Sequence, residues 1–300
     1  GVEAIAIASA RVQAGQADII IAGGTESMSL VPVMGWKTAL NYTVATSHPD
    51  YYSSMGITAE EVSKQYKISR EDQDKFSVES HQKAAAAWKA GKFKDEVVPI
   101  TVKEVFVDEA GKKKTREFVV ETDEGIRADT TLEGLSKLKP VFAVNGSVTA
   151  GNSSQTSDGA AFVCVMSDRM VKQLNLKPIA RMMSYAVAGV EPRIMGIGPV
   201  AAVPKALKQA GLKLDQVDII ELNEAFAAQS LAVIKELGFD RSKLNQNGGA
   251  IAVGHPLGSS GARLSVQLFN ELRRQKKKYG MVTACVGGGQ GVAGIYELLN

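Results

Sequence analysis

Residues Gly248 to Gly261 read GGAIAVGHPLGSSG. The five glycines of this stretch surround one histidine, His255, which Pro256 follows directly. Glycine lets backbone approach another group closely, and proline keeps the preceding residue out of the helical region. Ser259 and Ser260 then occupy the predicted N-cap of a helix. The pattern predicts an imidazole held on a stiff loop at the start of a helix; the alternative is a glycine-rich turn with an incidental histidine.

The composition is that of an ordinary globular protein. The chain has 300 residues, of which 45% are hydrophobic and 22% charged, and its net charge is +3. No apolar run approaches the roughly 18 residues that span a bilayer. The small excess of Lys and Arg does not indicate nucleic acid and suits an anionic small molecule equally well. Two cysteines are too few for a disulfide scaffold and indicate a reducing compartment. We therefore expect about two domains, no membrane or nucleic-acid partner, and a cytoplasmic, bacterial-like location, with a mitochondrial or peroxisomal one left open.

Two segments of the chain resemble each other. A helical pattern from Val2 to Gly15 leads into DIIIAGG at residues 18–24, and a second helical pattern after Gly261 leads into MVTACVGGG at residues 281–289. We interpret residues 18–24 as a buried parallel strand that runs into a glycine turn. Each unit is a helix followed by a strand that ends in glycines. This predicts the α/β class, as a duplicated α/β core with a site between two similar halves.

The α/β pattern is interrupted in the middle of the chain. Residues 29–146 combine irregular loops, helical segments and two charged strands, so we expect an inserted, mostly surface-facing loop domain. Ser69 caps a long helix in this domain, and His81 on that helix is predicted to be a solvated surface residue. The expected N-terminal half then consists of residues 1–28 and 147–176, and the C-terminal half of residues 177–300.

Two further residues at predicted strand ends carry candidate chemistry. Asn223 follows the strand 217–221, so its carboxamide can lie over a strand end, although a simple N-cap is the alternative. Cys285 precedes three glycines whose N–H groups can point at an oxyanion. These dipoles and a nearby imidazole can lower the pKa of Cys285, whereas Cys164 is predicted to be buried and inert. No His, Cys or carboxylate pair has metal-ligand spacing, so we expect no metal.

Three motifs together resemble the thiolases, the family of acetyl-CoA acetyltransferases and 3-ketoacyl-CoA thiolases. They are Asn223–Glu224–Ala225–Phe226, Gly254–His255–Pro256 and Cys285–Val286–Gly287–Gly288–Gly289. GGTESMS at residues 23–29 and GIGPV at residues 196–200 also look like motifs of this family, so the likeness covers the whole chain. It implies two α/β halves with mixed sheets and layered helices, and a loop domain over the site. It also implies acyl transfer, either cleavage of 3-ketoacyl-CoA by CoA or the reverse Claisen condensation of acetyl-CoA, with CoA as a substrate and no cofactor.

The same resemblance assigns roles to individual residues. His255 would activate the nucleophile and, with a water held by Asn223, bind a thioester oxygen. Cys285 would act as acid and base on the substrate's α-carbon or the incoming thiol, and the N–H of Gly287 would contribute to a second oxyanion site. The residues expected to line the CoA channel are Arg127 (near the nucleotide end), Ala150, Ser154, Met55 and Phe226. The expected partners are acyl-CoA, CoA and further copies of the chain, in a homodimer or homotetramer.

The nucleophile is the main departure from the family pattern. In thiolases it begins a Cys-x-x-Gly segment whose glycine corresponds to Gly1, so it falls three positions before this sequence starts. Neither Cys164 nor Cys285 can replace it, because the first lies within a strand and the second already has a role. Since no Met precedes the first helix either, we expect a truncated or processed chain.

Smaller features of the sequence bear on the type of thiolase and on two other classes of protein. QTSDG at residues 155–159 looks more like the degradative 3-ketoacyl-CoA type, which we favour. A non-catalytic, thiolase-like acyl-CoA or lipid-binding protein, or an inactive fragment, would keep the channel without the nucleophile. The set of His, Cys and Asn argues against the binding protein, because binding alone needs no acid/base pair. Condensing enzymes of the ketoacyl synthase type share the fold, but use two histidines, or His and Asn, opposite their cysteine.

Overall fold

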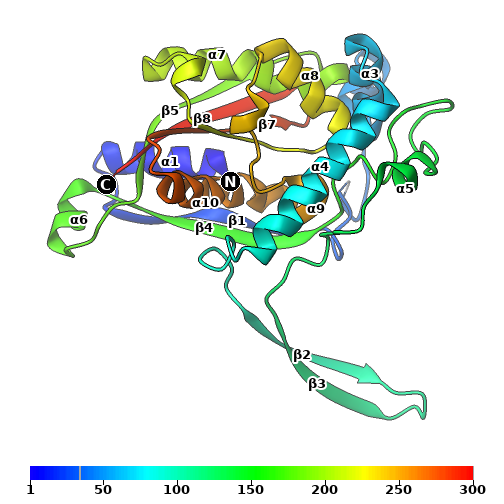
Figure 1. Ribbon diagram of the computed structural model, residues 1–300, viewed down its shortest axis with the longest axis horizontal. Coiled ribbons are helices and arrows are strands. Elements are labelled where there is room, and N and C mark those ends of the chain that lie inside the picture. Colours follow the sequence, from blue (N-terminus) through cyan, green and yellow to red (C-terminus); the bar gives the residue numbers. More distant parts are fainter. Residues whose placement is uncertain (34, 300) are drawn as a thin grey trace.

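The computed structural model describes residues 1–33 and 35–299, and arranges them in four alternating layers of helices and strands (Figure 1). Helices α7 (Gly198–Ala210) and α8 (Ala227–Leu237) form the first layer, and a four-stranded sheet forms the second. Helices α1 (Val2–Gln13) and α10 (Leu257–Gln275) form the third layer, and a two-stranded sheet forms the fourth. The predicted α/β class with mixed sheets and layered helices is confirmed.

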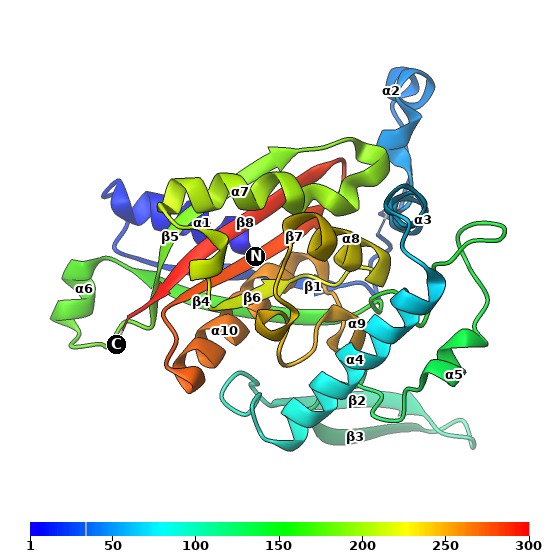
Figure 2. The same cartoon turned by 45° about the horizontal axis from the view of Figure 1, so that its top comes forward.

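The four-stranded sheet is buried on both faces. Its order is β5-β8-β7-β6; β6 and β7 run parallel, and the other neighbours are antiparallel. Ile220 faces the core formed with α7 and α8, whereas the adjacent Ile219 faces α1 and α10. Because successive side chains of a strand point to opposite faces, a sheet covered on both sides needs continuous apolar runs. Figure 2 shows α7 lying across β5 and β8. The strands are β5 (Ala180–Gly189), β6 (Ile219–Leu222), β7 (Tyr279–Val286) and β8 (Gln290–Leu298).

Helix α10 packs between the two sheets. Leu264, Leu268 and Leu272 are spaced four residues apart, which places them on one face of the helix, and all three are buried. Burial of a side chain of this size contributes roughly 1.5–3 kcal/mol relative to exposure. The segment that precedes this helix, including His255, is therefore attached to one of the most firmly packed elements of the molecule.

The two-stranded sheet differs from the prediction for residues 18–24. Strand β1 (Ile19–Ser27) pairs antiparallel with β4 (Asp158–Met166), and neither strand is fully buried. Ala22 packs against the helical layer, but the side chain of Ile21 is 74% exposed on the opposite face. Its partner across the ladder, Cys164, is also exposed, so the prediction of a buried Cys164 is wrong. An apolar run indicates a strand, but it does not reveal whether both faces of that strand are covered.

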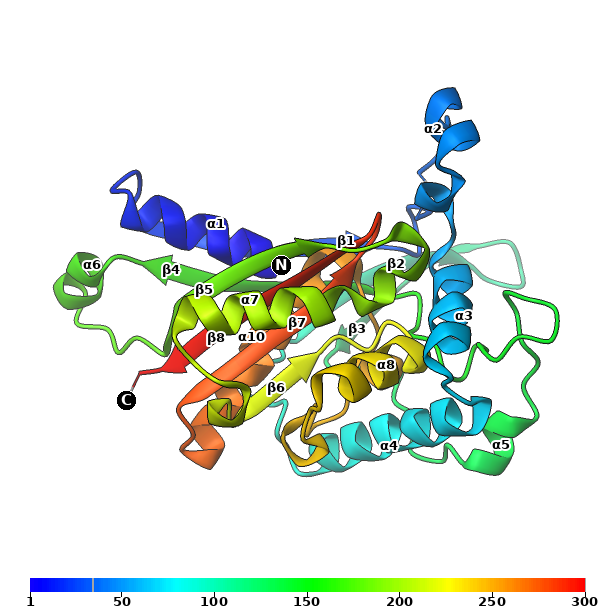
Figure 3. The ribbon, with the colours of Figure 1, turned by 90° about the horizontal axis from the view of Figure 1, so that it is seen from above.

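Residues between the two strands of this sheet form the rim of the molecule. Helices α3 (Met55–Tyr66) and α4 (Arg70–Lys89) pack beside α8, and Figure 3 shows α5 (Leu132–Ser136) next to α4. The predicted charged strands form a hairpin, β2 (Ile100–Val107) and β3 (Lys113–Val120), which projects away from the body (Figure 1). His81 on α4 is buried rather than solvated, because the loop around Arg127 covers it. The predicted domain boundaries stay a prediction. They assign residues 1–28 and 147–176 to the N-terminal half, residues 29–146 to the loop domain and residues 177–300 to the C-terminal half.

Short helices complete the fold. They are α2 (Tyr42–Ser47), α6 (Asp168–Gln173), α9 (Ala250–Val253), and the 3-10 helices η1 (Pro49–Tyr52), η2 (Pro192–Ile197), η3 (Leu214–Gln216) and η4 (Arg241–Lys243). Within residues 1–33 and 35–299, no helix has both the length and the apolar character needed to cross a membrane.

Glycines allow β1 and α1 to approach the first two turns of α10. A Cβ on Gly24 would lie 2.1 Å from the carbonyl oxygen of Gly258, and a Cβ on Gly1 would lie 2.2 Å from the backbone nitrogen of Ala262. The carboxylate of Glu26 also accepts a hydrogen bond from the Gly258 N–H at 3.0 Å, where the positive end of the helix dipole favours an anion. The two helix–strand units of the sequence repeat therefore meet at the start of α10.

Replacing Gly24 by alanine tests this close approach. The new Cβ meets backbone rather than a flexible side chain, so we expect Gly24→Ala to cost about 1–3 kcal/mol of stability, as overpacking does. Gly189→Ala is the matched control, because its Cβ would meet nothing closer than 4.0 Å. It should change stability by about 0.5 kcal/mol or less. Thermal unfolding of the two variants checks this, and equal midpoints would show that the contact at Gly24 is loose.

Candidate active site

His255 is the single residue between Gly254, the C-cap of α9, and Pro256, the N-cap of α10. Helix α10 begins at Leu257 with Pro256 as its N-cap. Ser259 and Ser260 therefore lie inside the first turn, and the prediction that they form the N-cap is wrong by three residues. Proline caps here because its own φ is fixed and its missing N–H is not needed at a helix start. This shift matters because it brings Ser260 one turn below the imidazole ring.

Two hydrogen bonds hold the ring of His255. Its Nδ1 lies 2.6 Å from the hydroxyl of Ser260, and its Nε2 lies 3.2 Å from the amide nitrogen of Asn223. Burial, together with the positive charge of Arg263, lowers the pKa of His255 to about 4. The imidazole is therefore neutral at pH 7, and a neutral imidazole can accept a proton.

Asn223 stands at the edge of the four-stranded sheet where the parallel strands β6 and β7 end. Its backbone N–H donates to the carbonyl of Thr283 at 2.9 Å, immediately after the ladder pair Leu222 and Thr283. Cys285 follows Thr283 by two residues on the neighbouring strand. Carboxyl ends of parallel strands meet at one edge, where α/β proteins commonly bind ligands. Asn223 thus belongs to the same edge as Cys285 and contacts His255 from another segment.

The environment of Cys285 differs from the prediction. Burial raises the pKa of Cys285 to about 12, whereas a lowered pKa was expected from the neighbouring glycine dipoles. At neutral pH the group is therefore a thiol, which can donate a proton. Gly287 lies in the exposed turn between β7 and β8, and a Cβ there would meet nothing within 4 Å. Its N–H is therefore in an open part of the site, next to the strand end that carries Cys285.

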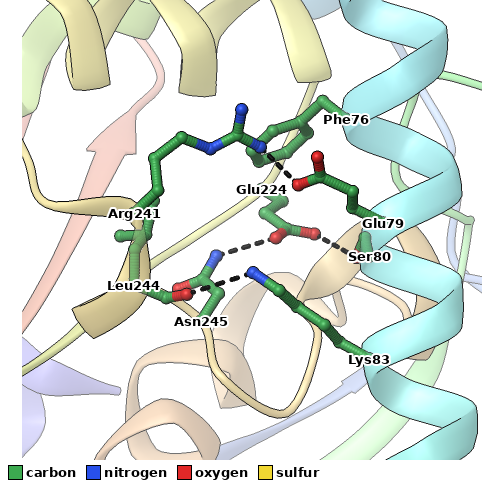
Figure 4. A pocket seen from close by; sticks show the side chains of 8 residues that line it. All are labelled: Phe76, Glu79, Ser80, Lys83, Glu224, Arg241, Leu244 and Asn245. Carbon is green, nitrogen blue, oxygen red and sulfur yellow. Dashed lines mark hydrogen bonds and ion pairs between the residues drawn. The ribbon is translucent and has the colours of Figure 1, made fainter.

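A buried carboxylate ties the Asn223 segment to the segment that leads to His255. Glu224 accepts hydrogen bonds from the hydroxyl of Ser80 at 2.6 Å, the amide of Asn245 at 2.8 Å and the N–H of Ile251 at 3.4 Å. Figure 4 shows Glu224 between α4 and the loop that carries Asn245. Burial raises the pKa of Glu224, and the hydrogen bonds from Ser80 and Asn245 oppose that shift. The side chain of Glu224 therefore links three elements: α4, the loop that carries Asn245, and α9.

The CoA-channel candidates Met55, Phe226 and Ser154 lie around the segment that follows Asn223. The ring of Phe226 meets that of Phe142 edge-to-face at 6.2 Å, and Phe142 packs on Gly56, the neighbour of Met55. The Ser154 N–H donates to the carbonyl of Ala225, the residue before Phe226, at 2.9 Å. Ser154 thus contacts the Asn223 loop directly, and Phe142 links the neighbour of Met55 to Phe226 in that loop.

Arg127 and Ala150 are exposed and more peripheral. The Arg127 N–H donates to Nδ1 of the buried His81 at 3.2 Å. Gln155 connects this loop to the site, because its amide nitrogen lies within 3.1 Å of the carbonyls of Gly125, Ile251 and Ala252. Ala150 lies in the turn before Ser154.

Three residues of this site were missed in the sequence: Glu224, Gln155 and Ser260. Each lies next to, or within a few residues of, a predicted functional residue. Glu224 directly follows Asn223, Gln155 follows Ser154, and Ser260 is one turn after Pro256. The available signal was a polar side chain within a motif that is otherwise small or apolar. Their partners are distant in sequence, so the contacts themselves could not be inferred.

Comparisons with known proteins agree with this arrangement. Residues 1–169 match the family model described as "Thiolase, N-terminal domain", and residues 176–298 match "Thiolase, C-terminal domain". The chain is 53% identical over 298 residues to the 3-ketoacyl-CoA thiolase of Bacillus subtilis, covering 99% of this chain and 76% of that protein. It is 48% identical over 305 residues to the acetyl-CoA acetyltransferase of Chromobacterium violaceum, covering 98% and 76%. The chain belongs to the thiolase family.

Solved structures show the same relationship. The crystal structure of human mitochondrial 3-ketoacyl-CoA thiolase superposes with a TM-score of 0.88 at 43% identity, over 99% of this chain and 76% of that one. A second structure of that human enzyme, in complex with CoA, gives a TM-score of 0.87 at 43% identity, over 100% and 76%. The dimeric peroxisomal thiolase of Saccharomyces cerevisiae gives 0.88 at 40% identity, over 99% and 73%.

Glu224→Ala tests the buried carboxylate. The variant leaves Ser80, Asn245 and the Ile251 N–H without their acceptor, so we expect a loss of about 2–5 kcal/mol in stability. Glu79→Ala is the control. Glu79 and Glu224 line the same small pocket, but Glu79 pairs with Arg241 at the surface (Figure 4). That exposed pair should contribute about 1 kcal/mol or less. Chemical denaturation of both variants measures the difference, and similar losses would mean that Glu224 does not connect these elements.

Proposed function

We propose that this thiolase-family chain performs CoA-dependent acyl transfer, cleaving 3-ketoacyl-CoA with CoA or running the reverse condensation. One observation carries the proposal: a neutral imidazole and a carboxamide, His255 and Asn223, are in contact beside the strand end that bears the protonated thiol of Cys285. A proton acceptor and a proton donor with well-separated pKa values suit a reaction that needs both.

The nucleophile in this proposal is the cysteine that the family resemblance assigns three positions before Gly1. Three residues span at most about 11 Å, so a residue there stays close to Gly1. Gly1 in turn contacts the first two turns of α10, beside Gly261, the residue after Ser260. This contact supports a nucleophile near His255, since the hydroxyl of Ser260 touches the imidazole.

The first half-reaction uses His255 as base and Cys285 as acid. The nucleophile gives its proton to Nε2 of His255, and its thiolate attacks the 3-keto carbonyl carbon. The resulting oxyanion takes hydrogen bonds from donors at the site, for which the Gly287 N–H is a candidate. The bond between C2 and C3 then breaks, its electron pair moves to C2, and Cys285 protonates that carbon. Acetyl-CoA leaves and the shortened acyl group stays on the nucleophile as a thioester.

The second half-reaction restores both residues. The Cys285 thiolate takes the proton of incoming CoA, whose sulfur attacks the acyl-enzyme thioester. The nucleophile leaves as a thiolate and recovers its proton from His255. A thiol that is protonated at rest, as the raised pKa of Cys285 requires, suits the cleavage written here, because Cys285 must donate a proton to C2 once the bond between C2 and C3 breaks. The 53% identity to a protein named 3-ketoacyl-CoA thiolase supports the degradative direction.

CoA enters this scheme as a substrate, and no cofactor takes part. Met55, Phe226, Ser154 and Ala150 would contact its pantetheine arm, because the first three surround the Asn223 loop through shared contacts. Arg127 is exposed at the rim, where a guanidinium can meet a phosphate. A relative solved with CoA bound supports this use of the channel. The non-catalytic acyl-CoA-binding alternative is less well supported, because it leaves the pairing of His255 with Asn223 unused.

Self-association is the second part of the proposal, as a homodimer or a homotetramer. One related thiolase structure is described as dimeric. The β2–β3 hairpin also carries exposed apolar residues on both strands, among them Val107 and Val119. An isolated two-stranded hairpin is marginally stable in water, so packing against another copy would stabilise it. The cytoplasmic location stays a prediction, since relatives include proteins named peroxisomal and mitochondrial.

Two substitutions separate the roles of acid and base. In the chain extended upstream through its Cys-x-x-Gly segment, His255→Ala should slow acylation by acetyl-CoA about 10²–10⁴-fold, because the general base is lost. Cys285→Ala should still acylate, because a thiolate leaves without an acid, but should fail to cleave acetoacetyl-CoA or a longer 3-ketoacyl-CoA. Mass spectrometry of the acyl-enzyme and an assay of cleavage measure the two steps.

The control for this pair is Cys164→Ala, which removes the exposed thiol on β4 and should leave both steps unchanged. Equal loss of both half-reactions in His255→Ala and Cys285→Ala would contradict the separate roles. If the unsubstituted, extended chain binds CoA but cleaves neither substrate, the binding-protein alternative is favoured.

Deleting the hairpin tests the assembly. Replacing residues 100–120 by a short Gly-Ser linker removes a segment that projects from the body, so the fold should remain (Figure 1). We expect a homotetramer that separates into dimers, measured as a halved mass by light scattering. Glu109→Ser at the hairpin turn is the control and should leave the mass unchanged. A monomeric parent chain would overturn self-association, and a tetrameric parent whose mass is unchanged after deletion would overturn the role of the hairpin.

A further inference from the structure

The hydroxyl of Ser260 connects the catalytic imidazole to the helix backbone. Ser260 Oγ lies 2.6 Å from Nδ1 of His255 and 2.8 Å from the carbonyl oxygen of Pro256, four residues earlier in the chain. Ser260 is 4% exposed, so water does not readily replace either contact. A serine within a helix commonly donates to the carbonyl four residues before it. The hydroxyl therefore touches one group that can only accept and one whose role depends on the tautomer.

A count of protons decides that tautomer. A hydroxyl has one proton to donate, so if Ser260 donates to the Pro256 carbonyl, its oxygen accepts from Nδ1–H of His255. Nε2 then carries a lone pair, which accepts from the amide nitrogen of Asn223 at 3.2 Å. These three hydrogen bonds form a series in which each donor meets an acceptor. The Asn223 amide donates to Nε2, Nδ1–H donates to Ser260, and the Ser260 hydroxyl donates to the Pro256 carbonyl.

The opposite assignment leaves a second buried N–H unpaired where the observed one leaves an oxygen. Rotating the Asn223 carboxamide would turn its oxygen toward Nε2–H and its NH₂ group into the position now held by Oδ1, which is buried and has no partner among the described residues. Two buried N–H donors would then lack acceptors. An unpaired carbonyl oxygen is tolerated more readily than an unpaired N–H. The observed orientation is therefore the less costly one.

We propose that Ser260 is a positioning residue that holds His255 in the Nδ1–H tautomer, so that Nε2 is unprotonated at rest and can take the nucleophile's proton in exchange for its hydrogen bond from Asn223. Free imidazole in water favours the other tautomer, so the protein must supply this preference. The role deepens the proposed function and depends on it for its catalytic meaning, whereas the placement of the proton depends only on the contacts of Ser260 and Asn223.

The catalytic consequence follows from which nitrogen is free. Nε2 can take the proton of the nucleophile only if it is unprotonated in the resting state. In the Nε2–H form, His255 would present a donor where a base is needed. In serine-protease triads, the wrong tautomer of a catalytic histidine lowers turnover by about 10⁴-fold. Ser260 does not touch the reacting atoms in this scheme, and acts only through the ring that it orients.

Nitrogen NMR of the chain selectively labelled with ¹⁵N-histidine tests the proposal. The chain has three histidines, and the signals of His255 are assigned by their loss in His255→Gln. At neutral pH, we expect Nδ1 to be the protonated nitrogen and Nε2 the unprotonated one. In Ser260→Ala the Nδ1–H form should fall to a minority, since the ring returns toward its preference in water. Ser260→Thr keeps a hydroxyl that can reach the same carbonyl and should restore the parent spectrum.

Ser259→Ala is the matched control. Ser259 is the neighbouring residue, is equally buried and also donates to the Pro256 carbonyl, at 3.2 Å, but its hydroxyl makes no hydrogen bond to His255 within the described part of the chain. It should retain the parent tautomer. Protonation of Nε2 in the unsubstituted chain would overturn the proposal outright, whether or not Ser260→Ala folds. Identical spectra for Ser260→Ala and Ser259→Ala would overturn it too.

A kinetic measurement separates this role from the proposed function. In the extended chain, Ser260→Ala should slow acylation by about 10- to 100-fold while the KM for acyl-CoA changes little, because the substrate contacts remain. An extended parent chain with the expected tautomer but no acylation would refute the proposed function and leave the proton placement standing. Normal acylation in a Ser260→Ala variant that has lost the Nδ1–H form would refute the catalytic role of Ser260.

Discussion

The contact between Asn223 and His255 is the interaction on which the site depends. It joins two segments 32 residues apart: the end of β6 and the loop before α10. Each segment is anchored separately, since β6 is a fully buried strand between two cores and α10 packs between two sheets. A hydrogen bond between two rigid elements costs little conformational entropy, because neither side chain must be ordered from a mobile state. The distance between the imidazole and the carboxamide is thus a property of the whole fold.

Buried polar groups around the site hold the segments that carry Asn223 and His255 in place. Glu224 holds the Asn223 segment to α4 and to the segment leading to His255, and Gln155 adds the loop that carries Arg127. Such groups are expensive to bury without partners, so their hydrogen bonds strongly favour one arrangement of the loops. Glu26 and Ser260 act similarly at the first turn of α10. The loops of the site are irregular in secondary structure but are held by side chains whose partners lie in rigid elements.

The sequence indicated candidate residues, two of which, His255 and Asn223, are in contact, but it did not indicate the pKa values of the candidate site. The glycine-rich stretch, Asn223 and Cys285 were recognised because strand ends and glycine turns leave local patterns. The pKa of Cys285 could not be predicted, because burial outweighs the nearby dipoles and depends on packing from distant elements. His81 was taken for a surface residue because its neighbours in sequence are polar, yet a loop more than 40 residues away covers it. Likewise, the apolar run of β1 predicted a strand but not its open face or its antiparallel partner.

For His255 and Cys285 to act in one reaction, a single acyl-CoA thioester must reach both residues. A crystal structure of the extended chain with an unreactive acyl-CoA analogue measures this directly. We expect the thioester carbonyl beside the ring of His255 and the α-carbon facing the sulfur of Cys285, with the pantetheine arm against Phe226. An analogue bound with its thioester away from either residue would contradict a single site built from these segments.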